Sequence, residues 1–317
     1  MAGIIELSKE YYCQEFLPAL RKAAPAVEPF LAVGLLGEGS ECFGFDDEKS
    51  RDHDYGPGFC IWLTDEYFGK YSEQLEAIIK GIPQAYGGMK SFFEKPRRGV
   101  LNLENFFCGL TGCDTSFFLT KATNNQEPHK QNIKWLSLSE SGLAAFTNGE
   151  VFADNEGTLS KLRQILQSGY PEDVNRYKLA QNLISLAQIT QYNYPRTYER
   201  NDGPALSIMK GRAIEYSCAI AFLINHKFKP YYKWSARALD NLDVLGKELH
   251  EMLTLFSRLP DGESAYDAMV GINKMIIEVF HKEGLSENDS EYLLDHVNEI
   301  VRKIQDKELL QQAIPLL

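Results

Sequence analysis

The sequence of 317 residues lacks three features that would each define a class of protein. It has no run of 18 apolar residues and no charged-then-apolar segment at its start, so we expect neither a membrane span nor a secretion signal. Its six cysteines include no CxxC pair, which argues against a disulfide framework or a zinc site. These absences favour a cytoplasmic protein whose cysteines stay reduced.

Basic residues are also in deficit, with 33 Lys and Arg against 44 Asp and Glu, for a net charge of −11. A protein that binds nucleic acid over a broad surface needs a basic face to neutralise phosphates. We therefore expect no extended nucleic-acid surface, although a local basic pocket is compatible with this charge. The composition, 44% hydrophobic and 24% charged, is typical of a globular protein with one large or two ordinary domains.

One segment carries most of the chemistry, and it reads FLAVGLLGEGSECFGFDDEKSRDHDYGPGFCIWLT. Its apolar runs, Phe30–Leu36 and Phe59–Leu63, predict two strands. A tight glycine-rich turn follows the first strand and leads into a short helical segment, residues 41–45. Backbone N–H groups at such a turn attract phosphate, so Gly39 and Ser40 are predicted to bind phosphate groups.

Asp52 and Asp54 lie two residues apart, shortly before the second predicted strand. On an extended segment this spacing places both carboxylates on one face, with His53 pointing the other way. Two adjacent carboxylates repel one another unless a cation lies between them. A hard divalent ion, Mg²⁺ with Mn²⁺ as an alternative, fits this pair and usually accompanies a phosphorylated substrate.

Three other motifs are excluded because residues they require are missing. A calcium loop starting at Asp52 would need its glycine one position later than Gly56 and a glutamate at the twelfth position. A P-loop would need lysine where Ser40 stands, and a dinucleotide-binding turn would need glycine at Cys42.

The pattern Gly39-Ser40, followed twelve residues later by Asp52-His53-Asp54, resembles the polymerase-beta-like nucleotidyltransferase superfamily. The resemblance implies that Gly-Ser holds a nucleoside triphosphate and that the aspartate pair binds Mg²⁺. The longer string GEGSECFGFDDEKSRDHDYGPGF is more similar to one uncharacterised bacterial family of that superfamily. Weaker similarity continues at residues 149–154 (GEVFAD) and 229–234 (KPYYKW).

A third metal carboxylate is expected in this superfamily on the next strand, here residues 97–103 (RRGVLNL). The best-matching positions are Gly99 and Val100, which offer no side-chain ligand. If the strand continued, Glu104 would share a face with Val100 and Asn102, so Glu104 is the tentative third ligand. Without it, two-metal chemistry is in doubt.

Helical periodicity dominates the rest of the chain. Helices are predicted over residues 6–23, with Ser8 as N-cap, and over 65–80, 105–112 and 135–146. From Thr158 onward six further segments have helical periodicity. The predicted fold is therefore α+β, with a nucleotidyltransferase-like domain with a mixed sheet over residues 1–150 and a helical bundle over 151–317.

Two basic segments of the second half are candidate contacts for a nucleotide or acceptor. Lys229, Tyr232 and Lys233 lie in the KPYYKW turn, and Arg212 lies on a predicted helix where Glu215 is a potential ion-pair partner. The alternative for the KPYYKW turn is a hydrophobic connection between helices.

The function implied by the resemblance is transfer of a nucleoside monophosphate from a Mg²⁺-bound nucleoside triphosphate to a hydroxyl or phosphate of an unknown acceptor, by analogy a small molecule. Two alternatives stay open. One is a nucleotide-binding regulatory protein that has lost catalysis, and the other is an antitoxin-like interaction partner. The sequence does not define the acceptor, the preferred base or the oligomeric state.

Overall fold

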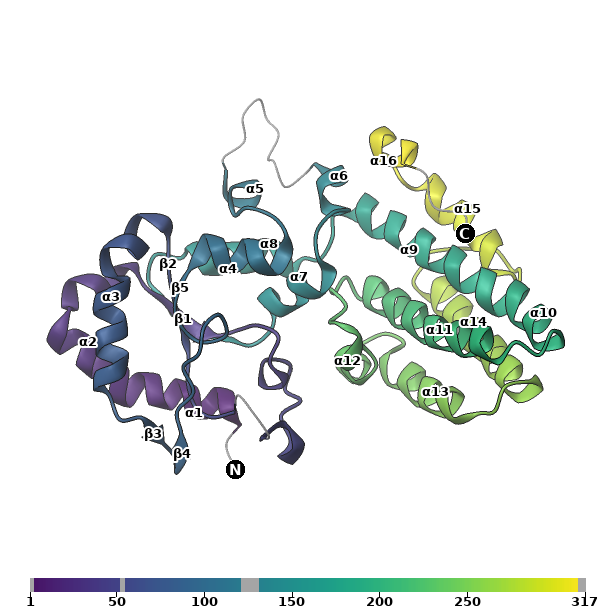
Figure 1. Cartoon of the computed structure of the whole chain (residues 1–317). Helices are drawn as coiled ribbons and strands as arrows, with labels where there is room; N and C mark the ends of the chain where they lie inside the picture. Colours follow the sequence, from purple (N-terminus) through teal and green to yellow (C-terminus); the bar gives the residue numbers. More distant parts are fainter. Residues whose placement is uncertain (1–2, 52–54, 121–130, 313–317) are drawn as a thin grey trace. The chain divides into compact units, whose positions relative to one another are not determined.

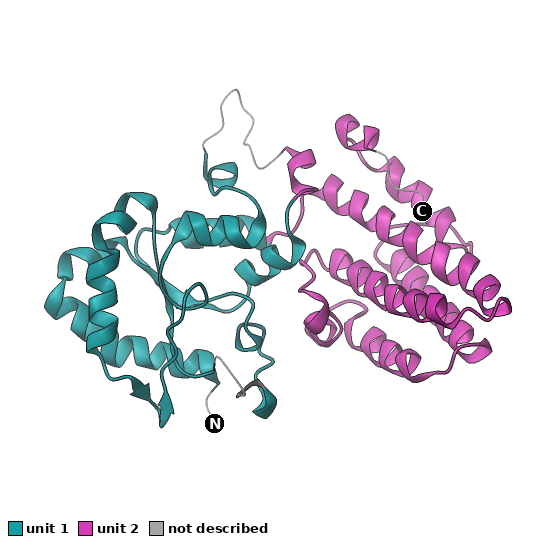
Figure 2. Cartoon of the chain, viewed as in Figure 1, with its two compact units in different colours: residues 1–129, 138–167 teal, residues 130–137, 168–317 magenta. Residues whose placement is uncertain are grey.

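The computed structural model describes residues 3–51, 55–120 and 131–312. The chain divides into two compact units (Figure 2). The first comprises Met1–His129 with Leu138–Gln167, and the second comprises Lys130–Ser137 with Ser168–Leu317. This division differs from the boundary expected after residue 150, because that boundary would cut strand β6 (Glu150–Asp154), which pairs with β1 in the first unit.

A four-stranded mixed sheet forms the centre of the first unit, in the order β5-β2-β1-β6. The strands are β1 (Ala32–Leu35), β2 (Cys60–Leu63), β5 (Gly99–Asn102) and β6. β1 is antiparallel to β2 and to β6, whereas β2 and β5 are parallel. The three predicted strands, over residues 30–36, 59–63 and 97–103, are confirmed in shortened form. β6 was not predicted, and its residues are only partly buried.

One face of the sheet is covered by α1 (Ile4–Tyr11), α2 (Leu17–Ala23) and α3 (Asp65–Gly81) (Figure 1). A π-helical turn, Tyr12–Phe16, joins α1 to α2 and makes the long leading helix continuous, as predicted. Phe59 is fully buried here, with edge-on contacts to the rings of Tyr11 and Phe16. This aromatic cluster holds the leading helices against the start of β2.

The other face packs on α4 (Leu103–Thr111), where the ring of Trp62 contacts Phe106 at a centroid distance of 5.3 Å. α7 (Glu140–Thr147) packs on α4 and leads into β6, which is followed by α8 (Thr158–Gln167). The short α5 (Ser116–Leu119) also contacts α8. The helix predicted over 135–146 is two helices, since α6 (Asn132–Trp135) ends before Ser139 caps α7.

A small hairpin, β3 (Ala85–Tyr86) with β4 (Met89–Lys90), follows α3. The chain leaving β4 runs against residues 56–58, and Phe92 N–H donates to the carbonyl of Pro57 at 2.9 Å. The hairpin thus leads into a segment that covers the stretch preceding β2.

The second unit is helical among its described residues, and α9 (Glu172–Ala187) packs against both α11 and α15. Its other elements are α6, a π-helical turn (Gln188–Asn193), α10 (Tyr194–Glu199), α11 (Gly203–Ile224), α12 (Tyr232–Ser235), a 3₁₀ turn (Arg237–Asn241), α13 (Gly246–Arg258), α14 (Glu263–Lys282), α15 (Leu293–Arg302) and α16 (Lys307–Gln311). The predicted α+β class, a mixed sheet followed by a C-terminal helical bundle, is confirmed.

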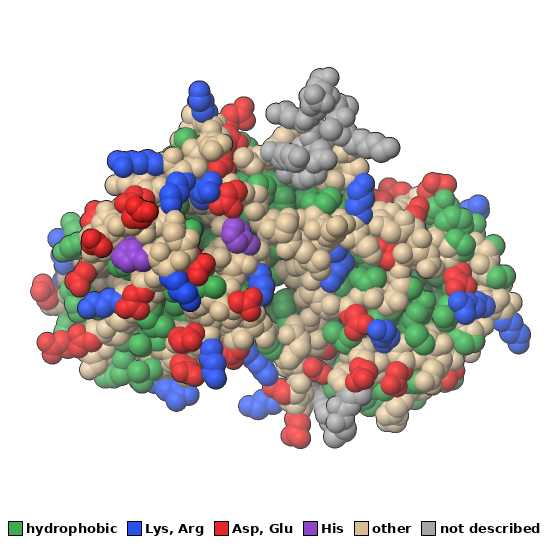
Figure 3. All heavy atoms as spheres, turned by 180° about the vertical axis from the view of Figure 1, so that it is seen from behind, with side chains coloured by type: hydrophobic (Ala, Val, Ile, Leu, Met, Phe, Trp, Pro, Cys, Tyr) green, Lys and Arg blue, Asp and Glu red, His purple; other side chains and the backbone are tan. Residues whose placement is uncertain are grey.

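Charged side chains of both signs are interspersed over the face of the molecule drawn in Figure 3. Within the described ranges, no helix combines the length and the apolar character needed to cross a membrane.

Candidate functional site

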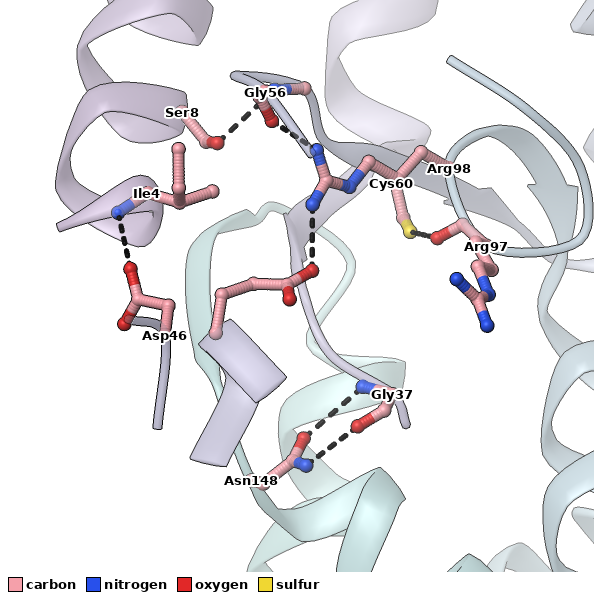
Figure 4. A network of polar contacts seen from close by, with 11 residues as sticks. Ile4, Ser8, Gly37, Asp46, Gly56, Cys60, Arg97, Arg98 and Asn148 are labelled. Carbon is pink, nitrogen blue, oxygen red and sulfur yellow. Dashed lines mark hydrogen bonds and ion pairs between the residues drawn. The ribbon is translucent and has the colours of Figure 1, made fainter. Parts of the chain in front are cut away.

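The edge of the sheet where β1 ends is the edge where β2 and β5 begin. Gly34 near the end of β1 pairs with Cys60, and Cys60 pairs with Gly99 at the start of β5. The turn that leaves β1 and the segment that enters β2 therefore converge at one edge. Figure 4 shows the polar contacts made there.

The glycine-rich turn predicted to bind phosphate, residues 37–42 and called the phosphate turn below, follows shortly after β1. Gly37 has a φ of +130°, a conformation that favours glycine, and Gly39 is extended. A 3₁₀ helix spans Ser40–Phe43, one residue earlier than the helical segment predicted from the sequence. The Ser40 side chain is half-buried, and its hydroxyl has no hydrogen bond to another described residue.

Glu41 folds back over this turn. A Cβ atom on Gly39 would lie between 2.4 and 2.6 Å from the carboxylate of Glu41, so a side chain at position 39 would displace Glu41. The Glu41 carboxylate instead accepts a hydrogen bond from Arg98 at 2.6 Å and forms an ion pair with it. Glycine at position 39 is thus explained by the close approach of the Glu41 side chain, since its extended backbone is open to any residue.

Arg98 connects three segments at the start of β5. Its side chain is only 2% exposed and donates to the carboxylate of Glu41 and to the backbone carbonyl of Gly56 (Figure 4). Its guanidinium also lies over the ring of Phe92, 5.1 Å from the centroid. Arg98 therefore ties the phosphate turn to Gly56, which follows Asp54 by two residues in the sequence.

The glycines of the Gly56-Pro57-Gly58 sequence allow the end of β4 and the chain after it to approach closely. A Cβ atom on Gly56 would lie 2.2 Å from the carbonyl oxygen of Lys90, and one on Gly58 would lie 2.1 Å from that of Phe92. Ser8 is not the N-cap that the sequence predicted, because α1 begins at Ile4 and Ser8 lies within it. Its buried hydroxyl accepts a hydrogen bond from Gly58 N–H at 3.1 Å.

Asn148, between α7 and β6, binds the first residue of the turn. Its Oδ1 accepts from Gly37 N–H at 3.1 Å, and its Nδ2 donates to the Gly37 carbonyl at 2.7 Å. The next residue, Gly149, donates its N–H to the Cys42 carbonyl at 2.9 Å. Residues 148 and 149 therefore contact both ends of the turn.

Asp52, His53 and Asp54 lie outside the described residues, so the predicted metal pair stays a prediction. Among the described residues, no group of three or more His, Cys, Asp or Glu side chains is arranged to hold a metal ion. The neighbouring Asp46 accepts a hydrogen bond from Ile4 N–H at the start of α1, at 3.4 Å. This contact places Asp46 at a helix N-terminus, where a carboxylate is stabilising.

The strand-based assignment of Glu104 is wrong. β5 ends at Asn102, whose side chain caps α4 by accepting from Asn105 N–H, and Glu104 lies in the first turn of that helix. Because β2 and β5 are parallel, Asn102 lies beside Leu63, at the end of the sheet opposite to Ser40. Burial raises the pKa of Glu104, and the negative charge of Asp65 raises it further. The structure does not bring Glu104 together with the phosphate turn.

The candidate nucleotide or acceptor contacts of the second unit differ in their partners and exposure. Lys229 pairs with Glu215 at 3.9 Å and its side chain is only 13% exposed, so Glu215 has a partner other than the expected Arg212. Tyr232, 81% exposed, and Lys233, whose ammonium group lies 4.8 Å from the centroid of the Trp234 ring, are on the surface. Arg212 is also exposed. Their role as nucleotide or acceptor contacts stays a prediction.

Two cysteines near the turn are predicted to be unreactive. Cys42 and Cys60 are buried, and burial raises the pKa of both thiols, that of Cys60 to about 12. Because the thiolate is the nucleophile, alkylation of the native protein at pH 8 should modify exposed Cys13 and Cys108 and leave Cys42 and Cys60 unmodified until the protein unfolds. Peptide mass mapping measures this pattern, and rapid labelling of native Cys60 would contradict it.

The chain is an α+β protein with a polar network at one sheet edge. Residues 135–235, about a third of the chain, match a domain of unknown function (DUF4037). The matched range includes Asn148 and the KPYYKW turn but not the phosphate turn or the aspartate pair.

One solved structure, a nucleotidyltransferase-like protein from Exiguobacterium sibiricum 255-15, is similar to this chain at 9% sequence identity and a TM-score of 0.36. The alignment covers 90% of this chain and 87% of that chain. Comparison with curated proteins finds no match.

Proposed function

We propose that this chain is a Mg²⁺-dependent nucleotidyltransferase whose nucleotide site lies at the edge of the sheet where β1 ends. One observation carries the proposal. Arg98 joins Glu41, the residue after Ser40, to Gly56, two residues after Asp54. The phosphate turn and the described chain that follows the aspartate pair in sequence are therefore tied to one another by a buried side chain, which supports the proposal.

In the proposed reaction, Gly39 and Ser40 hold the outer phosphates of a nucleoside triphosphate. Asp52 and Asp54 would hold the metal ion, which when bound would supply neutralisation of phosphate charge. An oxygen of the acceptor hydroxyl or phosphate forms a bond to the α-phosphorus, the bond from the α-phosphorus to the α,β-bridging oxygen breaks, and pyrophosphate leaves. An attacking hydroxyl releases its proton to solvent. Catalysis of this kind depends mainly on positioning and charge neutralisation.

A second candidate function is favoured by the residues of β5. Gly99 and Val100 lie beside Cys60 and Ile61, and neither has a side chain that binds metal. Glu104 lies at the opposite end of the sheet. A protein that binds Mg²⁺-nucleotide and has lost transfer activity fits this arrangement, since Mg²⁺ can be held by two carboxylates and substrate phosphates.

Calorimetry with Mg-ATP and Mg-GTP, followed by a pyrophosphate-release assay with cell extract as the source of acceptor, separates these functions. Binding with release supports the transferase, and binding without release supports the regulatory protein. Absence of binding rejects both.

Replacing both Asp52 and Asp54 by asparagine should abolish Mg²⁺-dependent nucleotide binding, with a loss of at least roughly a hundredfold in affinity, about 2.7 kcal/mol. The matched control replaces Asp46 and Asp47 by asparagine, which removes the same charge from the same segment. Both variants should unfold near the wild-type temperature. If the Asp52 and Asp54 variant keeps its affinity, the metal assignment is wrong.

A further inference from the structure

Asn148 and Gly149 bind both ends of the phosphate turn, and this set of hydrogen bonds is called the bracket. The Asn148 side chain forms hydrogen bonds with both the N–H and the carbonyl of Gly37, and the Gly149 N–H donates to the Cys42 carbonyl. The two contacted residues, Gly37 and Cys42, lie on either side of Gly39 and Ser40 in the chain. The turn is therefore fixed at two points by consecutive residues that are more than a hundred positions away.

Asn148 is itself held in place by its neighbours. Its N–H donates to the Ala144 carbonyl at the end of α7, and its carbonyl accepts from Arg163 at 2.8 Å. Arg163, on α8, is buried and donates also to the carbonyls of Phe146 and Thr147, at 2.6 and 3.1 Å. Because α7 and α8 hold its backbone in this way, Asn148 has little freedom to follow a displaced turn.

Sheet pairing alone does not account for this bracket. β1 and β6 are already joined through Gly34 with Val151 and Leu35 with Glu150. The Asn148 amide binds beyond the last of these pairs, at a residue whose φ of +130° has left the strand conformation. Its hydrogen bonds fix an irregular turn and do not extend the ladder.

We propose that Asn148 is a positioning residue of the nucleotide site, which holds Gly37 so that Ser40 and the N–H groups of the turn are aligned with the outer phosphates. The inference rests on the proposed nucleotide binding at Gly39 and Ser40. A turn ordered before the ligand arrives avoids the entropy cost of ordering it on binding. Loss of the bracket should therefore weaken contacts to the outer phosphates more than contacts to the rest of the nucleotide.

The test compares Asn148→Ala with Asn225→Ala. Asn225 in the second unit makes the same reciprocal pair with one backbone residue, since it accepts from Val244 N–H at 3.0 Å and donates to the Val244 carbonyl at 2.9 Å. Both asparagines are partly buried. Asn225 also donates to the Ala221 carbonyl at 2.8 Å, so its variant loses at least as many hydrogen bonds, and only the Asn148 variant loses a contact to the phosphate turn.

Titration calorimetry of each full-length variant with Mg-ATP and Mg-ADP should show at least a tenfold weaker Mg-ATP affinity for Asn148→Ala. The preference for Mg-ATP over Mg-ADP should fall by a similar factor. Asn225→Ala should stay within twofold of wild type for both ligands. A merely destabilised protein would lose apparent affinity for both nucleotides equally, which would overturn the proposal.

Asn148→Asp provides a second variant that keeps the acceptor for Gly37 N–H and places a carboxylate against the Gly37 carbonyl. It should show the same loss of preference if Asn148→Ala does not fold. Wild-type affinity for Mg-ATP in either folded Asn148 variant overturns the positioning role alone. Failure of the wild-type protein to bind Mg-nucleotide overturns the proposed function, and the positioning role with it.

Discussion

Replacing Arg98 by methionine should destabilise the first unit by about 3–5 kcal/mol, because the change leaves a buried carboxylate without its counter-charge. Glu41 is 13% exposed and is paired with Arg98, and the carbonyl of Gly56 would also lose its donor. Replacing Arg98 by methionine and Glu41 by leucine together should restore most of this loss, since both charges are then absent. Chemical denaturation monitored by circular dichroism measures both effects.

Arg176→Met is the matched control in the second unit. Arg176 pairs with Glu172 at 2.8 Å and with Asp173 at 3.3 Å, but its side chain is 25% exposed. Its removal should therefore cost no more than about 1 kcal/mol. If the single Arg98 variant is as stable as the double variant, the Arg98 and Glu41 charges do not depend on one another. The double variant also lacks the tether to Gly56, so it should bind Mg-nucleotide poorly despite its restored stability.

Gly149→Ala should be the other strongly destabilising change, with a loss of at least about 3 kcal/mol. Gly149 has a φ of +60°, and a Cβ atom there would lie 2.0 Å from the Leu35 carbonyl oxygen. Because the obstacle is backbone, the end of β1 would have to move away from β6. Urea unfolding measures the change.

Gly157→Ala separates the cost of the left-handed backbone conformation from the cost of the contact with Leu35. Gly157, with a φ of +78°, has nothing within 4 Å of an added Cβ atom, so its substitution carries only the cost of the left-handed conformation, about 1–2 kcal/mol. Equal losses for the two variants would mean that contact with Leu35 is relieved at little cost. A larger loss at Gly149 indicates that the end of β1 is held rigidly.

The local sequence pattern was sufficient to predict the strands and helices that glycine or proline residues delimit. β1 lies in an apolar run between Pro29 and Gly37, β2 in one that follows Pro57-Gly58, and α3 has an apolar stripe that ends at Gly81. β6 was missed as a strand because its residues are only partly buried, so its pairing with β1 leaves little hydrophobic pattern. The domain boundary was misplaced for the same reason.

The candidate site was predictable only in its local part. Gly39 and Ser40 follow β1 as the pattern indicated, but Arg98 and Asn148 contact the turn across 57 and 111 residues of sequence. Polar contacts over such distances leave no periodicity that a single sequence reveals. The error at Glu104 was avoidable, because Asn102 followed by an acidic residue in the next turn is a helix start, and its side chain accepts from Asn105 N–H at 2.8 Å.

The order in which the chain contributes segments to its two units restricts how the protein can be cut into separate units. The segment Lys130–Ser137 belongs to the helical unit, yet the chain then returns to supply α7, β6 and α8 to the sheet unit. No single cut in the polypeptide releases either unit whole. A gene fusion or recombination event with one breakpoint would therefore inherit an incomplete unit, so the two units are expected to have been transmitted as one block.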